Sequence, residues 1–136
     1  MKSFLGALMA LSLASPAYAT SFTTAAEIKP ILGATKANWV AVREWDGQDL
    51  LYFTHLESWR CGLDQVRYFV NEGKPRIWQM EECYIDTNAP NALKLEGRVP
   101  YTELPLQSIQ SVTIEITYDD GSIERETFQR NQVLMP

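Results

Sequence analysis

Cysteine and histidine are scarce in this chain: 136 residues include two Cys and one His. Such a count excludes a large metal centre built from thiolate and imidazole ligands. Basic side chains are also in deficit, with 12 Lys+Arg against 17 Asp+Glu and a formal net charge of -5. Binding of duplex nucleic acid requires clustered basic residues that release counterions, so the charge argues against this class of partner. We therefore expect no metal, no cofactor and no nucleic acid.

Long hydrophobic runs and enzyme signatures are missing as well. The most apolar run, Phe4–Ala14, is much shorter than the ~20 residues that a membrane-spanning helix needs. Neither a G-x-S-x-G elbow nor H-E-x-x-H, a Walker loop or G-x-G-x-x-G occurs. We therefore expect a protein that does not span the membrane, and the motifs assign no catalytic residue.

What is present begins with a targeting pattern at the N-terminus. Lys2 supplies a positive charge, Phe4–Ala14 is almost wholly apolar, and Ala17-Tyr18-Ala19 has the spacing of an A-x-A cleavage site. Together these three parts are typical of a secretory signal peptide. We expect residues 1–19 to be that signal peptide and residues 20–136 to form a single compact β-rich domain. The mature protein is then periplasmic or secreted.

The two cysteines, Cys61 and Cys83, form an even pair, which in an exported protein favours a disulfide. Two strand-like runs, Asp64–Asn71 and Pro75–Tyr84, are separated by a turn-like Asn-Glu-Gly-Lys sequence. Folding the chain back about that turn places the cysteines at the open end of a hairpin, one residue or a bulge out of register. The alternative is a zinc site that adds His55, but no C-x-x-C or H-x-x-x-H pair supports it.

The rest of the chain predicts one short helix followed by antiparallel hairpins. A helix is expected within Thr24–Ala37, where Thr24 and Glu27 form a capping box and Pro30 weakens the helical pattern. Residues 86–105 are expected to be mostly loop. The expected strands are Asn38–Trp45, Leu50–Leu56, Asp64–Asn71, Pro75–Tyr84, Ala92–Leu95, Val112–Tyr118 and Ile123–Gln129. The predicted fold class is α+β and β-rich, with antiparallel hairpins, a short N-terminal helix and one disulfide.

The first of these hairpins has no polar face. Alternation places Val42 and Leu51 on one face, and Arg43, Trp45 and Tyr52 on the other. One short helix cannot cover both faces, so part of the aromatic surface is expected to stay exposed. Aromatic and Arg side chains dominate the energetics of protein interfaces. We interpret six residues of this region as a binding surface: Trp39, Trp45, Tyr52, His55, Trp59 and Arg60.

Three functional hypotheses follow from these features. The first is a non-enzymatic periplasmic module that binds a protein or a small ligand through its aromatic hairpin surface. The second is a small hydrolase-type enzyme in which His55 acts as a general base beside Glu57 or Asp49. The third is a structural component of the cell envelope.

Three segments carry a resemblance to other proteins. They are Lys29-Pro30-Ile31-Leu32, the run from Asp46-Gly47-Gln48-Asp49 through Leu50-Leu51-Tyr52-Phe53-Thr54-His55, and Trp59-Arg60-Cys61-Gly62-Leu63. Across residues 27–118 the chain resembles a family of small exported proteins of proteobacteria whose function is unknown. The resemblance implies a periplasmic address and no particular activity.

Overall fold

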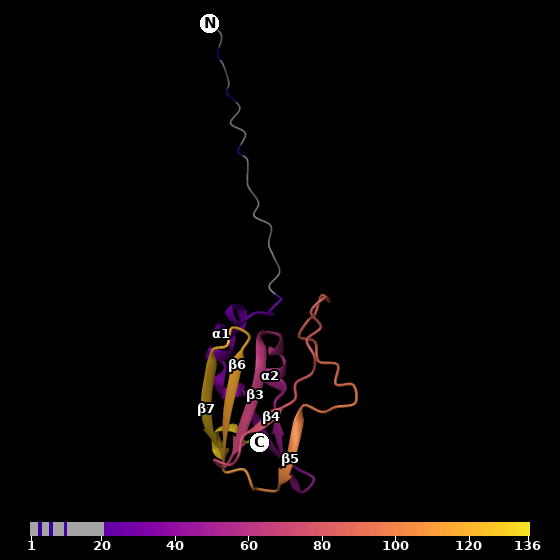
Figure 1. Ribbon diagram of the computed structural model, residues 1–136, viewed down its shortest axis with the longest axis vertical. Helices are drawn as coiled ribbons and strands as arrows, with labels where there is room; N and C mark the ends of the chain where they lie inside the picture. The colour runs from indigo at the N-terminus through magenta and orange to yellow at the C-terminus, as the bar shows by residue number, and fades with distance from the viewer. Residues whose placement is uncertain (1–2, 4–5, 7–9, 11–20) are drawn as a thin grey trace.

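The computed structural model describes residues 3, 6, 10 and 21–136 of the chain (Figure 1). Apart from those three positions, the predicted signal peptide lies outside the described residues. Two of the elements, η1 and η2, are single 3₁₀ turns. In chain order the elements are α1 (Ala25–Ala34), η1 (Lys36–Asn38), β1 (Ala41–Trp45), β2 (Gln48–Tyr52), α2 (Thr54–Glu57), η2 (Arg60–Gly62), β3 (Leu63–Val70), β4 (Arg76–Trp78), β5 (Tyr101–Pro105), β6 (Ser111–Tyr118), β7 (Ile123–Gln129) and α3 (Arg130–Val133).

The strands form two antiparallel sheets, which confirms the predicted α+β class. One sheet has the strand order β1-β2-β5 and the other β4-β3-β6-β7. Three hairpins predicted from turn chemistry are present, because β1 pairs with β2, β3 with β4, and β6 with β7. Side chains from both sheets and α1 contribute to one hydrophobic core, and its largest fully buried members are Trp39, Tyr118 and Phe53. Among the described helices, none is long and apolar enough to cross a membrane.

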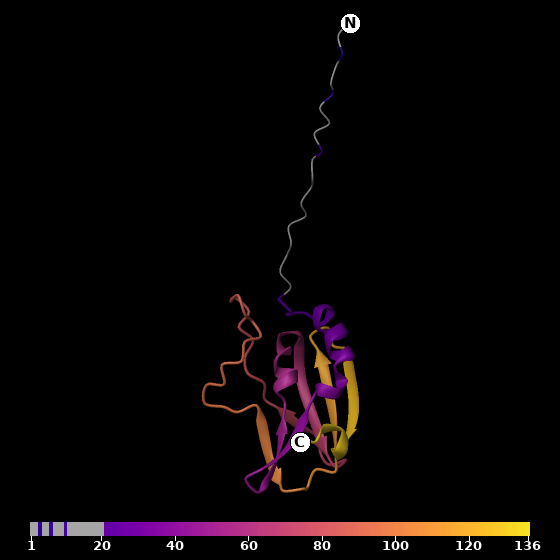
Figure 2. The same ribbon diagram turned by 180° about the vertical axis from the view of Figure 1, so that it is seen from behind.

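The N-terminal helix α1 begins where the sequence predicts. The Thr24 hydroxyl accepts a hydrogen bond from the Glu27 N–H at 3.3 Å, and the Glu27 carboxylate accepts one from the Phe22 N–H at 3.2 Å. Ile28 is fully buried, and the helix lies over β6 and β7 (Figure 2). A Cβ on Gly62 would come within 2.6 Å of the Ile28 Cδ1 atom, so only glycine allows η2 to approach the helix so closely.

Three predicted strands are wrong in extent. The first begins at Ala41 rather than Asn38, because Asn38 belongs to η1. The second ends at Tyr52 rather than Leu56, because the chain turns into α2 at Thr54. The strand expected over Pro75–Tyr84 is only Arg76–Trp78, since the chain beyond Trp78 leaves the sheet.

The predicted strand at Ala92–Leu95 is also wrong. Those residues are irregular, and the strand of this region is instead β5, Tyr101–Pro105, which pairs with β2. Proline is tolerated at strand ends and on edge strands, where its missing N–H interrupts no ladder. The end of β5 is therefore compatible with Pro105, although proline-rich sequence favours a loop.

Candidate functional site

The predicted disulfide is formed, with a Cα–Cα distance of 5.2 Å between Cys61 and Cys83. The β3/β4 ladder ends at the pair Val66 and Trp78, so both cysteines lie beyond it, on the side away from the turn. A zinc site with cysteine ligands is excluded because both sulfurs are bonded to each other. Among the described residues, no group of three or more His, Cys, Asp or Glu side chains could hold a metal ion.

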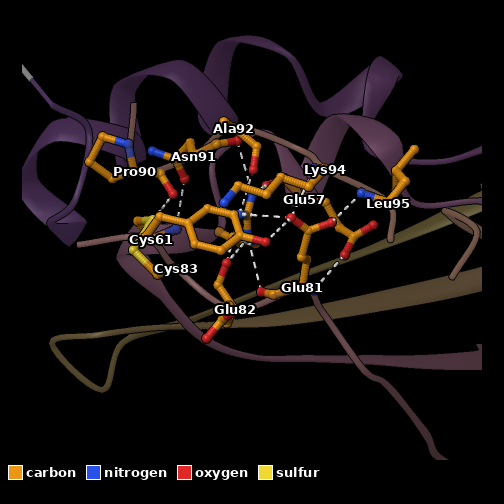
Figure 3. A network of polar contacts seen from close by, with 12 residues as sticks. Glu57, Cys61, Glu81, Glu82, Cys83, Pro90, Asn91, Ala92, Lys94 and Leu95 are labelled. Atoms are coloured by element: carbon orange, nitrogen blue, oxygen red, sulfur yellow. Dashed lines mark hydrogen bonds and ion pairs between the residues drawn. A yellow bond between two sulfur atoms is a disulfide. The ribbon is translucent and has the colours of Figure 1, made fainter. Parts of the chain in front are cut away.

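Arg60, predicted as part of the binding surface, is instead buried, with only 2% of its surface exposed. It lies beneath the irregular segment formed by residues 79–100. Backbone carbonyls in such a segment have no ladder partners and need other donors when they are buried. The Arg60 guanidinium supplies these donors at 2.7–3.0 Å (Figure 3). It donates to the carbonyls of Glu57, Glu81, Glu82, Asn91 and Ala92.

Two glutamates complete this buried network. Glu57 is fully buried and accepts from Arg98 at 2.8 Å and from the Glu81 N–H at 2.8 Å. Burial opposes ionisation of Glu81, but hydrogen bonds from the N–H of Lys94, the Tyr84 hydroxyl and a second backbone N–H outweigh it and lower its pKa to about 2. The hydrogen bond that the Tyr84 hydroxyl donates to Glu81 also raises the pKa of Tyr84 to about 12. We call Arg60, Glu57, Glu81 and Arg98 the buried clamp.

A second buried carboxylate, Asp49, is also fully engaged. It accepts from Arg130 at 2.6 Å and from the N–H groups of Gln107 at 3.0 Å and Ile109 at 3.1 Å. Burial opposes its ionisation, yet these donors hold the pKa of Asp49 below its ordinary value. Neither Asp49 nor Glu57 pairs with His55. In residues 21–136 no hydrogen bond or ion pair joins that imidazole to a carboxylate.

Side chains along the first hairpin alternate between a face that packs against the core and a face that is turned outwards. Val42 and Leu51 are fully buried, whereas Trp45 keeps 56% of its surface exposed. Cross-strand neighbours share a face, so the antiparallel register extends the exposed side over all three strands of its sheet. We call it the outer face, and it consists of Ala41, Arg43, Trp45, Gln48, Leu50, Tyr52, Tyr101, Glu103 and Pro105. Its central residue, Leu50, is nevertheless buried, with 3% of its surface exposed.

Aromatic rings and one guanidinium dominate the outer face. The Arg43 guanidinium carbon lies 4.1 Å from the centroid of the Trp45 ring, which is a cation–π geometry. The rings of Tyr52 and Tyr101 pack with their centroids 5.0 Å apart. The expected exposure of Trp45 and partial exposure of Tyr52 are thus observed.

A cavity of about 440 Å³ opens at the end of the outer face. Its walls are mostly apolar, and Arg43 supplies the one permanently charged side chain among the residues that line it. Three residues of the predicted binding surface, Trp39, Tyr52 and His55, lie together here. The complete lining is Asn38, Trp39, Val40, Ala41, Arg43, Tyr52, Thr54, His55 and Met135.

His55 lies half-buried in the cavity wall. Its Nε2 atom is 2.8 Å from the Thr35 hydroxyl oxygen, and that hydroxyl donates its only hydrogen to the Ile31 carbonyl at 2.7 Å. The Nε2 atom is therefore the donor in this pair, and Nδ1 is left as an acceptor. Burial lowers the pKa of His55, so the ring is neutral at neutral pH.

Of the two other tryptophans of the predicted surface, Trp39 does not lie as expected, whereas Trp59 stays partly exposed. Trp39 is fully buried, because η1 turns the chain before β1 starts and its indole N–H donates to the Leu32 carbonyl at 2.9 Å. Trp59 is partly buried against Phe22, with ring centroids 5.1 Å apart. Trp39 therefore forms a wall of the core, and Trp59 lies outside the cavity lining.

Sequence reasoning did not include Arg43, Tyr101 and Met135 among the candidate site residues. Alternation alone placed Arg43 on the exposed face of the hairpin, so that signal was available. Tyr101 falls in a segment expected to be loop, and Met135 reaches the site through the hydrogen bond of its N–H to the Val42 carbonyl at 2.8 Å. Comparisons of the chain with protein-family models, with curated proteins and with solved structures find no match.

Proposed function

We propose that this protein is a non-enzymatic binding module that holds a small ligand with an apolar body. The observation that carries the proposal is the cavity of about 440 Å³ with mostly apolar walls, open beside the aromatic outer face. Small-molecule sites are concave and mostly apolar, with volumes of about 300–1,000 Å³. The size and lining of this cavity match that class, which favours a small ligand over a flat protein partner.

The polar groups around the cavity support binding rather than catalysis. His55 donates to Thr35 and has no carboxylate partner among the residues described, so no acid–base pair is assembled. Asp49 and Glu57 are each bound to an arginine. We further propose that the protein acts in the periplasm or outside the cell, with which its disulfide is compatible.

Titration with 1-anilinonaphthalene, an uncharged probe that fluoresces in apolar surroundings, tests the proposal. We expect saturable binding of one probe per chain. Ala41→Phe fills part of the cavity and should weaken binding about tenfold, as the loss of ~1.4 kcal/mol would. Gln48→Phe places the same ring on the outer face away from the cavity lining and should leave affinity within about twofold.

The absence of saturable binding, or an equal effect of the two substitutions, would contradict the proposal. Circular dichroism and thermal unfolding of both variants establish that they fold. If Ala41→Phe proves too large for the fold, Ala41→Leu fills less of the same space and should weaken binding in the same direction.

A further inference from the structure

Arg43 is a half-buried cation whose donors are unused. It makes no hydrogen bond and no ion pair to the residues the structure describes; its recorded contact is with the Trp45 ring. Five other arginines in that part of the chain form ion pairs with carboxylates: Arg60, Arg67, Arg98, Arg125 and Arg130. Arg76 also lacks a partner among the described residues, but it is exposed and lines neither of the two hollows that Arg43 lines.

The position of Arg43 suits recognition of a group from outside. It lines the cavity of about 440 Å³ and also a neighbouring hollow of about 330 Å³ that includes Trp45 and Met135. Stacking on an aromatic ring leaves the in-plane N–H edges of a guanidinium free to bind a carboxylate or similar anion with two parallel hydrogen bonds. Trp45 therefore contacts the Arg43 guanidinium without accepting a hydrogen bond from it.

Glu44 and the last residue, Pro136, line the second hollow together with Arg43, but the structure shows no ion pair between Arg43 and either of them. Glu44 binds Arg130 at 2.7 Å, and Asp49 binds the same arginine from the core side of the hairpin. Glu103 lies in the same cross-strand row, but Leu50 separates it from Arg43. The guanidinium therefore has room for an anion supplied by a ligand.

The remaining polar groups of the cavity limit the ligand to one negative charge. Because His55 is neutral, it offers an acceptor rather than a second cation. The chain as a whole carries a net charge of -5, which repels polyanions at long range. A ligand with a single anionic group on an apolar body fits both the neutral His55 and the negative net charge of the chain.

We infer that the ligand is an amphipathic monoanion whose apolar body fills the cavity and whose carboxylate-like or sulfonate-like group binds the Arg43 guanidinium. This inference rests on the proposed function, because it assigns the polar end of the same ligand. It predicts selectivity between two molecules that differ only in the anionic group.

The test compares 1-anilinonaphthalene with 8-anilinonaphthalene-1-sulfonate, which adds one sulfonate to the same ring system. We expect the sulfonate to bind the unaltered protein about tenfold more tightly, the effect of one charge-assisted contact. Arg43→Gln should abolish that preference, measured as the ratio of the affinities of the two probes for the same variant. Arg76→Gln removes an equally unpaired cation elsewhere and should leave the preference intact.

The outcomes separate the two proposals. Equal affinity of the unaltered protein for both probes overturns the anion inference but leaves the proposed binding function standing. A preference that survives Arg43→Gln also overturns it, because the sulfonate then binds elsewhere. Failure of both probes to bind contradicts the proposed function itself. Should Arg43→Gln not fold, Arg43→Lys keeps the charge but loses the two-point geometry and should reduce the preference.

Discussion

Two arginines of this protein stand beside aromatic rings and do different work. The Arg60 guanidinium carbon lies 5.6 Å from the Tyr84 ring centroid, and that of Arg43 lies 4.1 Å from the Trp45 ring centroid. Arg60 is 2% exposed and bonds five backbone carbonyls, whereas Arg43 bonds none. The backbone around each explains the contrast. Residues 79–100 lack a ladder and need donors, while β1 is already paired with β2.

An arginine next to an aromatic ring is therefore not by itself a binding residue. Its role depends on how many unpaired acceptors the surrounding main chain offers. Where the main chain is irregular and buried, its unpaired carbonyls accept the hydrogen bonds of a guanidinium, which is then not available to a ligand. Arg43 lies on the paired strand β1, where no carbonyl or carboxylate takes up its donors, so it stays available to a ligand. Arg67 and Arg125 also lie on paired strands, but they bind Glu115.

Replacing the buried arginine should have the largest effect. Arg60→Met leaves several buried carbonyls without donors and removes the cation 3.7 Å from the Glu81 carboxylate, so the free energy of unfolding should fall by about 3–5 kcal/mol. Urea denaturation measures it. Arg43→Gln is the matched control and should change stability by less than about 0.5 kcal/mol. Equal losses in the two variants would refute the contrast between the two arginines.

Removal of the disulfide should have the next largest effect. Cys61→Ser combined with Cys83→Ser frees a loop with a sequence separation of 22 and should cost about 3 kcal/mol. Because Cys83 directly follows Glu81 and Glu82, whose carbonyls Arg60 binds, the double variant should be cleaved by protease first within residues 79–100. Initial cleavage in the β1–β2 hairpin would instead show that the disulfide does not secure the clamp.

The smallest effect concerns the pH dependence of stability that is due to His55, which lines the cavity together with Arg43. Burial lowers the pKa of His55 below 6.5, so the folded protein binds this proton more weakly than the unfolded chain. The stability from the neutral ring is complete above pH 6.5 and declines as the pH falls towards the lowered pKa. Urea unfolding at about pH 7.5 and about pH 5.5 should show this decline, and His55→Gln should lessen it. An unchanged pH dependence in the variant would contradict the assignment.

The features predicted correctly from sequence are those set by local chemistry. The Thr24 cap, the three hairpins and the disulfide each depend on residues close together in the chain or across one short turn. The turn between Trp45 and Gln48 also establishes which residues share the outer face. Such signals do not require knowledge of distant partners.

The incorrect predictions concern features that depend on contacts between residues far apart in the sequence. β5 pairs with β2 across a long stretch of sequence, and its flanking prolines favour a loop. Arg60 is bound by main-chain carbonyls, which leave no mark in the amino-acid pattern. Trp39 fits the strand alternation, but η1 redirects it into the core. The cavity itself could not be foreseen because Met135 and Tyr52 meet only after folding.

The ion pair between Asp49 and Arg130 bears on the order in which parts of the chain can fold. Asp49 emerges early during synthesis, but its cation belongs to α3, near the end of the described chain. Until Arg130 arrives, burying this carboxylate is unfavourable, so the first hairpin cannot settle against the core. Arg130 of α3 therefore links the burial of Asp49 to a residue 81 positions later in the sequence.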